Sequence, residues 1–352
     1  MEVSFVGDVS FTGNFAENLN LKKDIISSEL VSFLGESSYA VVNLEGPCTT
    51  LPSQRKDVEV LSPPAALDYL KQINVSHVSL ANNHIFDCGK IGLKHTVNQA
   101  SESGLTVLGL TDDIAYGFEI IEGSDLKIGM ISICQSYKNM GEDCKASVNI
   151  YDEVKFKAFI SEVKSKVDWI VVNYHGGEEY TIYPWPSRRR FLHSLLNMGA
   201  SIIVCHHSHT VQPYEKVGND KFIFYSLGNF VFDLENHKNK SFLNDSVILK
   251  IKFKQKSLSV SFIPVLINPK TGTVIKADKD LGHFYLLNDR QYQRSKWNAE
   301  CARVFSERNR VSAHTSSASS SFKLLNKIRT VLFNAEFRAV IVGYILNKFS
   351  SR

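Results

Sequence analysis

The chain has no closely spaced cysteine pair, no long apolar run and no dominant charge, and each absence excludes a class of protein. Its six cysteines show no Cys-x-x-Cys spacing, which argues against a zinc ribbon or a redox motif. No stretch reaches the roughly 18 uncharged apolar residues that a membrane span requires. The first residues, MEVSFVGDVSF, lack the basic start and the apolar segment of a secretory signal. These absences predict a cytoplasmic protein with reduced thiols.

The bulk composition is that of an ordinary globular protein, with 352 residues, 43% hydrophobic and 22% charged. The net charge of +4 gives no sign of a nucleic-acid partner, but the charge is unevenly distributed. Residues 290–352 hold 12 Lys and Arg against 3 Asp and Glu, a net of +9, which leaves −5 for the rest of the chain. A mildly acidic body therefore carries a basic tail.

Short apolar runs alternate with helix-like segments over the first two-thirds of the chain, and most of these runs end in polar residues. The expected strands are residues 3–6, 39–43, 106–109, 127–134, 169–173, 202–205 and 222–225, with one more ending before Asn82. The expected helices are residues 63–72, 151–166 and 186–198. Repetition of strand, polar cluster and helix indicates a layered α/β fold with a site at the strand ends.

The pattern changes twice in the last third of the chain. From 247 to 277 apolar and polar residues alternate with a period of two, which indicates an antiparallel β-hairpin. Residues 316–321, SSASSS, form a flexible linker, and 322–349 has the pattern of one or two basic helices. Such helices either bind anionic lipid or pack on the body or another subunit, and both interpretations stay open.

The run SLANNHIFDCG, residues 79–89, is the most informative stretch. An apolar segment stops at two asparagines and a histidine, so that Asn83 can offer an oxygen to a metal and His84 a proton or a ring nitrogen. Taken alone, a strand followed by an Asn-rich turn explains this run equally well. The polar residues at the other strand ends favour a site: Asp8, Asn43, Glu45, His175, His207 and His209. Carboxylate, amide oxygen and imidazole are the ligand types of Mn, Fe and Zn.

Six motifs in order resemble one family: GDVSF, NLEG, SLANNHIFDCG, HGGEEY, HHSHTVQPYE and FYSLGNFVFD. Over about Met1 to Asp233 the chain resembles the CapA/poly-γ-glutamate capsule-synthesis family of the calcineurin-like metallophosphoesterase superfamily. The resemblance implies a four-layer α/β/β/α sandwich. We expect it to occupy residues 1–245, with a hairpin at 246–289 that completes the core and a basic helical tail at 290–352.

The resemblance also implies roles for individual residues. Glu45 matches the bridging carboxylate, and His84 matches the histidine that protonates the leaving oxygen. The implied metal ligands are Asp8, Glu45, Asn83, His175, His207 and His209. The candidate substrate contacts are Asn43, Asn82, His206, Ser226, Asn229 and Arg188. Asn82 is expected to support its own loop, as are Asp87 and Gly89.

The chain departs from the superfamily pattern at several positions. The first motif usually reads Asp-x-His, but its third position here is Ser10, which weakens one of two metal positions. Gly176 and Ser208 stand where the family often has Trp and Pro. One or two divalent ions (Mn, Zn or Fe) are therefore both compatible with the motifs.

Other side chains have plainer interpretations. Arg188 begins a run of three arginines that could grip carboxylates or phosphates, although the solvated face of a helix is favoured. Tyr180 and Trp185 could stack on a substrate, although packing is favoured. Cys205 is expected to be buried and inert. Three histidines are expected to be structural or to lie on the surface: His77, His193 and His237.

Two functions remain after these arguments. The first is a capsule or exopolymer biosynthesis protein of poly-γ-glutamate type, with a metal-dependent, hydrolase-like site acting on an anionic polymer or phosphoester. The second is a non-catalytic assembly or binding component of a capsule-synthesis complex, which Ser10 favours and His84 disfavours. Expected partners are other capsule-synthesis proteins and, through the tail, the inner face of the membrane, but no nucleic acid.

Overall fold

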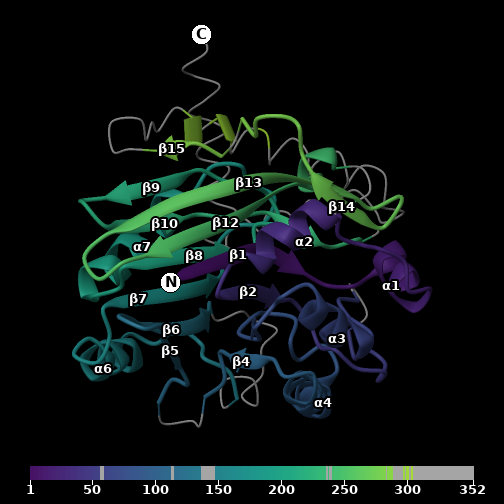
Figure 1. Ribbon diagram of the computed structural model, residues 1–352, viewed down its shortest axis with the longest axis horizontal. Helices are drawn as coiled ribbons and strands as arrows, with labels where there is room; N and C mark the ends of the chain where they lie inside the picture. Colours follow the sequence, from purple (N-terminus) through teal and green to yellow (C-terminus); the bar gives the residue numbers. More distant parts are fainter. Residues whose placement is uncertain are drawn as a thin grey trace, which may run out of the picture.

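The computed structural model describes residues 1–303 except 56–58, 112–114, 136–146, 235–236, 238–239, 283, 288–295, 298 and 301–302. Two β-sheets pack face to face, and helices cover the outer face of each (Figure 1). The α/β/β/α sandwich expected from the motifs is therefore confirmed. The expected linker at 316–321 and the helices at 322–349 lie outside the described residues.

The first sheet is built around β1 (Glu2–Val9). On one side β1 continues in parallel strands β2 (Tyr39–Leu44), β3 (His77–Ser79) and β4 (Thr106–Leu108). On the other side it continues in antiparallel strands β12 (Asp245–Phe253), β13 (Leu258–Asn268) and β14 (Thr273–Lys276). The short β11 (Asn229–Val231) pairs with the end of β1.

The second sheet has the order β15-β9-β10-β8-β7-β6-β5. Its parallel centre consists of β6 (Lys127–Cys134), β7 (Trp169–His175), β8 (Ile202–His206) and β10 (Lys221–Phe224). Its outer strands are β5 (Glu119–Glu122), β9 (Tyr214–Val217) and β15 (Leu286–Leu287). The central strands read as apolar runs because both of their faces are buried.

Three apolar layers hold the sandwich together. Between the sheets, Val3 and Phe5 of β1 pack in one cluster with Val171 and Val204 of the second sheet. The outer face of the first sheet is covered by α1 (Gly13–Asn20), α2 (Ser28–Gly35), α3 (Ala65–Gln72) and α4 (Gly89–Glu102). The outer face of the second is covered by α6 (Glu153–Val163) and α7 (Pro186–Met198).

The expected hairpin is confirmed, and it belongs to the first sheet. β12 pairs with β13 along nine residue pairs and with β1 on its other edge. Strands β9 and β11 and helices α1, α2 and α4 were not expected from the sequence. None of the helices within the described part of the chain has the length and apolar character needed to cross a bilayer. Four cysteines within the described residues are buried: Cys48, Cys88, Cys134 and Cys205.

Candidate metal centre

The carboxyl ends of strands from both sheets meet at one edge of the sandwich. Asp8 lies near the end of β1, Glu45 directly follows β2, and His175 ends β7. The backbone N–H of His207, just after β8, donates to Asp8 Oδ2 at 3.1 Å. This bond joins the two sheets at the site, where open α/β folds place their ligands.

A glycine permits the close approach behind Asp8. A Cβ on Gly7 would lie 2.1 Å from the carbonyl oxygen of Gly228. The same carbonyl accepts a hydrogen bond from the Asp8 N–H at 3.0 Å. The absence of a side chain at Gly7 therefore lets the loop before β11 lie against β1.

Glu45 is the most unusual residue of the site. It is 0% exposed, and neither of its carboxylate oxygens has a hydrogen-bond partner within the described residues. Two imidazole nitrogens lie near its carboxylate, His209 Nε2 at 3.8 Å and His84 Nε2 at 3.9 Å. Burial raises the pKa of Glu45 well above its ordinary value, and the negative charge of Asp8 adds to the shift. Such a carboxylate is costly to bury unless a cation compensates it.

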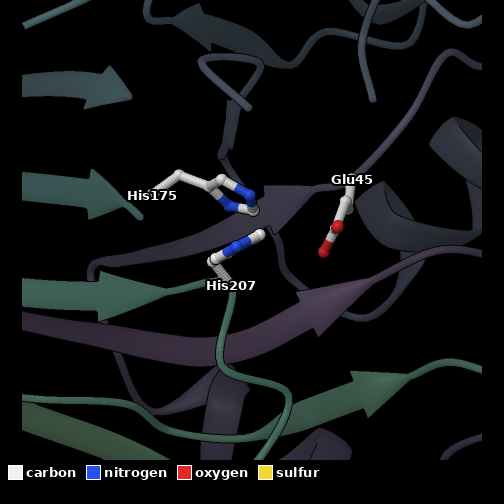
Figure 2. Close-up of side chains that lie close together, drawn as sticks. All are labelled: Glu45, His175 and His207. Atoms are coloured by element: carbon white, nitrogen blue, oxygen red, sulfur yellow. The ribbon is translucent and has the colours of Figure 1, made fainter. Parts of the chain in front are cut away.

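Two sets of side chains in the described chain have the spacing to hold a metal ion, and Glu45 belongs to both. One set is Glu45, His175 and His207, and the other is Asp8, Glu45 and His209, with ligand atoms within 4.8 Å of one another in each. Figure 2 shows the His175 and His207 rings and the Glu45 carboxylate around one space at the strand ends. A carboxylate shared by two sets is placed as a bridging ligand would be.

The protonation states suit metal binding. Burial lowers the pKa of His175 well below its ordinary value, and the neighbouring His207 adds to this effect. Burial also lowers the pKa of His207 to about 4, so both rings are neutral near pH 7. For Asp8, burial raises the pKa, but the hydrogen bond and positive charge of His206 outweigh it and leave the pKa below its ordinary value. The donor set therefore includes a charged carboxylate, Asp8, and two neutral imidazoles, which fits Mn, Fe or Zn.

Amide side chains orient the candidate ligands. Asn43 Nδ2 donates to Asp8 Oδ1 at 2.9 Å and lies 3.2 Å from His175 Nδ1. Asn229 Oδ1 lies 2.9 Å from His209 Nδ1. Partners of this kind fix ring orientation in metal sites. Contact of Asn43 and Asn229 with a substrate stays a prediction.

The SLANNHIFDCG run divides its roles among neighbouring residues. Asn83 Oδ1 lies 2.7 Å from His175 Nε2, so Asn83 reaches the centre from the first sheet. Asn82 is fully buried: its Nδ2 donates to the Leu44 carbonyl at 2.8 Å, and its Oδ1 accepts from backbone N–H groups. These bonds make Asn82 a support for the loop.

His84 stands between the centre and an acidic partner. Its Nδ1 lies 2.7 Å from Asp87 Oδ2, while its Nε2 is turned toward Glu45. Arg55, which the sequence did not single out, lies 3.5 Å from His84 Nδ1 and 3.8 Å from Asp87 Oδ1. Asp87 therefore fixes the ring of His84, a role beyond the support of the loop that the motif implied.

The loop after β8 has a strained backbone. His207 and His209 have φ of 89° and 57°, in the left-handed region that costs a non-glycine residue about 1–2 kcal/mol. Arg188 holds this loop: its guanidinium donates to Ser208 Oγ at 2.9 Å and to the Tyr225 carbonyl at 2.7 Å. Arg188 is only 4% exposed, so the expectation of a solvated helix face is wrong for this residue. Helix α7 turns that side chain inward, toward the loop.

The other expected contacts also lie at this edge. His206 Nδ1 is 3.2 Å from Asp8 Oδ1. Ser226 is fully buried, and its Oγ accepts from the Gly228 N–H at 3.2 Å. His206 thus contacts a candidate ligand, and Ser226 contacts the loop before β11. Contact of either side chain with a substrate stays a prediction.

The sequence predicted only part of the aromatic rim that borders the centre. The Tyr180 ring stacks on His209 with centroids 6.0 Å apart, and its hydroxyl lies 3.2 Å from His237 Nε2. His237 is buried, and burial together with the charge of His209 lowers its pKa to about 2. The sequence offered Tyr180 as a residue that could stack on a substrate but favoured packing for it, whereas His237 carries no local signal.

Two packed sheets with outer helices, and a carboxylate–histidine cluster at the strand ends, define a metallophosphoesterase-like sandwich. Within that class, the family model of the bacterial capsule synthesis protein PGA_cap matches residues 2–234, and the chain belongs to this family. The resemblance drawn from the six motifs is thus confirmed.

Relatives of known name agree with this membership. The PGA biosynthesis protein CapA of Bacillus subtilis is 28% identical over 289 residues, which cover 79% of this chain and 74% of the relative. The capsule biosynthesis protein CapA of Bacillus anthracis is 27% identical, over 66% of this chain and 60% of its own. Among solved structures, a 5'-nucleotidase of Candida albicans is a distant match, with 10% identity, a TM-score of 0.44, and coverage of 77% of this chain and 53% of its own.

Proposed function

We propose that this protein acts in the synthesis of a poly-γ-glutamate-type capsule or exopolymer through a divalent-metal, hydrolase-like site for an anionic polymer or phosphoester. The observation that carries the proposal is the Glu45 carboxylate, fully buried with no hydrogen-bond partner among the described residues and shared by two ligand sets. Membership of the capsule-synthesis family and the names of the two Bacillus relatives support the biological setting.

The residues that would hold the metal are those at the strand ends: Asp8, Glu45, Asn83, His175, His207 and His209. A divalent cation bound there supplies a Lewis acid and an activated water. Asn43 and Asn229 keep the ligands oriented through the hydrogen bonds described above. The negative charge of an anionic substrate suits a cationic centre of this kind.

His84 is the candidate acid. Its Nδ1 is engaged by Asp87 at 2.7 Å, so that the Nε2 atom is directed toward the centre. In the protonated ring, Nε2–H would donate its proton to the leaving oxygen, and the Asp87 carboxylate would stabilise the charged ring beforehand. This arrangement gives His84 a task that simple binding of a metal would not require.

A binding component without turnover is the second candidate, and Ser10 is the observation that favours it. Ser10 is buried where the superfamily motif usually has a histidine, and its Oγ has no hydrogen-bond partner within the described residues. One metal position therefore has one ligand fewer than the superfamily pattern supplies. A centre of this kind could hold an anionic polymer without cleaving it.

The test combines metal content with hydrolysis. Bound metal is measured by elemental analysis, and cleavage of generic phosphoesters and of γ-glutamyl chains is measured for wild type, His84→Ala and a control, His193→Ala. We expect bound metal in all three proteins, and a loss of turnover of at least about 100-fold in His84→Ala alone. Absence of both metal and cleavage in the wild type refutes the hydrolase. Bound metal without cleavage of either substrate supports the binding component, and turnover that is unchanged in His84→Ala contradicts the role of His84 as the acid.

A further inference from the structure

The last described segment of the chain packs against the loop that follows His175. Its apolar contact is a cluster of Tyr183, Trp185, Leu287 and Trp297. Within it, the rings of Trp185 and Trp297 meet edge-on with centroids 5.9 Å apart. Trp297 lies beyond the residues that the family model matches. The chain thus brings a segment from outside the family region onto a loop of the candidate metal centre.

Glu300 and Arg303 fasten the same loop through its backbone. The Glu300 carboxylate accepts from the Ile182 N–H at 2.7 Å, and the Arg303 guanidinium donates to the Tyr180 carbonyl at 2.5 Å. The two side chains also pair with each other, with Nη2 and Oε1 2.6 Å apart. Glu300 is only 5% exposed. Charge-assisted hydrogen bonds in such a setting are among the stronger polar contacts, and we name this pair the Glu300–Arg303 clamp.

Tyr180 connects the clamp with the candidate ligands. Its ring stacks on His209, and its backbone N–H donates to the Ser208 carbonyl at 2.9 Å. The next residue, Thr181, accepts from Gln212 Nε2 at 2.6 Å through its carbonyl. Tyr180 has φ of 63°, which is costly for a residue other than glycine, so bonds on both sides are needed to hold it.

We infer that Glu300 and Arg303 hold Tyr180 against His209 and are therefore positioning residues for the metal centre. The bonds run from the clamp to residues 180–182 and from there to residues 208–212, where His209 has its strained backbone. The expected effect of the clamp on metal binding rests on the proposed function, whereas its expected effect on the two loops does not.

Hydrogen exchange on the full chain, read by mass spectrometry without metal, tests the effect on the loops. Arg303→Ala and Glu300→Ala are compared with wild type and with Lys276→Ala, which breaks an exposed ion pair with Glu29. We expect exchange to rise about tenfold in residues 178–185 and 206–212 of both clamp variants, and to stay unchanged in Lys276→Ala. Equal exchange of residues 206–212 in all four proteins overturns the inference.

A cobalt titration tests the effect on the centre, because Co²⁺ bound by histidine and carboxylate absorbs visible light. We expect Arg303→Ala to bind Co²⁺ about tenfold more weakly and with a changed spectrum. Arg303→Lys, which keeps a cation able to donate to the Tyr180 carbonyl, should recover part of the affinity. Unchanged affinity and spectrum in Arg303→Ala overturn the link to the metal. A wild type that binds no Co²⁺ refutes the proposed function instead, and the exchange data still decide whether the clamp holds the two loops.

Discussion

Glu45 and Glu215 are two equally buried glutamates with opposite surroundings. Glu215, on β9, is 2% exposed and is contacted by Arg189 Nε at 2.8 Å, His193 Nε2 at 2.6 Å and Tyr225 Oη at 2.9 Å. Glu45 is 0% exposed and has no hydrogen-bond donor among the described residues. Burial raises the pKa of both, but the hydrogen bonds of His193 and Arg189 leave that of Glu215 below its ordinary value.

The difference separates a structural carboxylate from one that is arranged for a ligand. Side chains of the protein provide the hydrogen-bond partners of the Glu215 carboxylate. These bonds connect α7 with β9 and with Tyr225, which follows β10. Around Glu45 the protein supplies imidazoles that burial keeps neutral, such as His175, and these can share a cation with the carboxylate but do not neutralise it. Four experiments test this difference between the two glutamates and the site around Glu45.

The largest effect is expected for Glu45→Gln. In the wild type, a metal present at a thousand times its Kd should stabilise the fold by about 4 kcal/mol. The variant should lose this stabilisation, because the shared ligand is gone. In chelator its free energy of unfolding should be no lower than that of the wild type, since a carboxyl group whose ionisation is disfavoured by burial has been replaced by a neutral amide. Chemical denaturation with and without Mn²⁺ measures both quantities.

Glu215→Gln should show the reverse behaviour. Loss of the charge-assisted bonds to Arg189 and His193 should lower the free energy of unfolding by about 2 kcal/mol, with or without metal. The affinity for metal should stay unchanged, because Glu215 does not reach the centre. The same denaturation series measures this, and a loss of metal binding in Glu215→Gln would contradict the division of roles.

Asn229→Ala tests the orientation of His209. Removal of the amide oxygen 2.9 Å from His209 Nδ1 should weaken metal binding about tenfold, the low end for such partners. Calorimetric titration with Mn²⁺ or Zn²⁺ gives the affinity. An unchanged affinity would show that the bond does not orient the ring.

The smallest effect is expected in how the stability of the fold depends on acidic pH through Glu215. Its pKa is lower in the folded state than in the unfolded chain, so its contribution is complete above the unfolded value near 4.3 and is lost as pH falls through the folded value. The wild type should therefore lose stability below about pH 4.5 more steeply than Glu215→Gln. Denaturation curves between about pH 3 and 6 show this, and parallel curves would argue against the pairing of Glu215.

The sequence predicted elements best where one strong pattern acts alone. The apolar run of β6 and the proline-started α7 have the expected bounds, Lys127–Cys134 and Pro186–Met198. The short β11 and β9 were missed because their pairing with β1 and β10 depends on tertiary packing rather than on a local period. The sequence correctly predicted that the polar residues at the strand ends lie together, because the carboxyl ends of parallel strands meet at one edge of a sheet.

The support of the site was harder to predict than its ligands. Arg188 was assigned to solvent because an arginine run usually lies on a solvated face, yet its helix turns it toward Ser208. His237 and Arg303 contact Tyr180 although both are distant from it in the sequence, and neither lies in a motif. Such contacts depend on how loops fold over one another, which local patterns do not encode.

The most direct test is a crystal of the protein soaked in Mn²⁺, with anomalous diffraction recorded at a wavelength where manganese scatters. We expect a peak about 2.0–2.3 Å from a Glu45 oxygen and close to His207 or His209. A Glu45→Gln crystal treated in the same way should lack this peak. A strong data set without anomalous density beside Glu45 would contradict the metal centre.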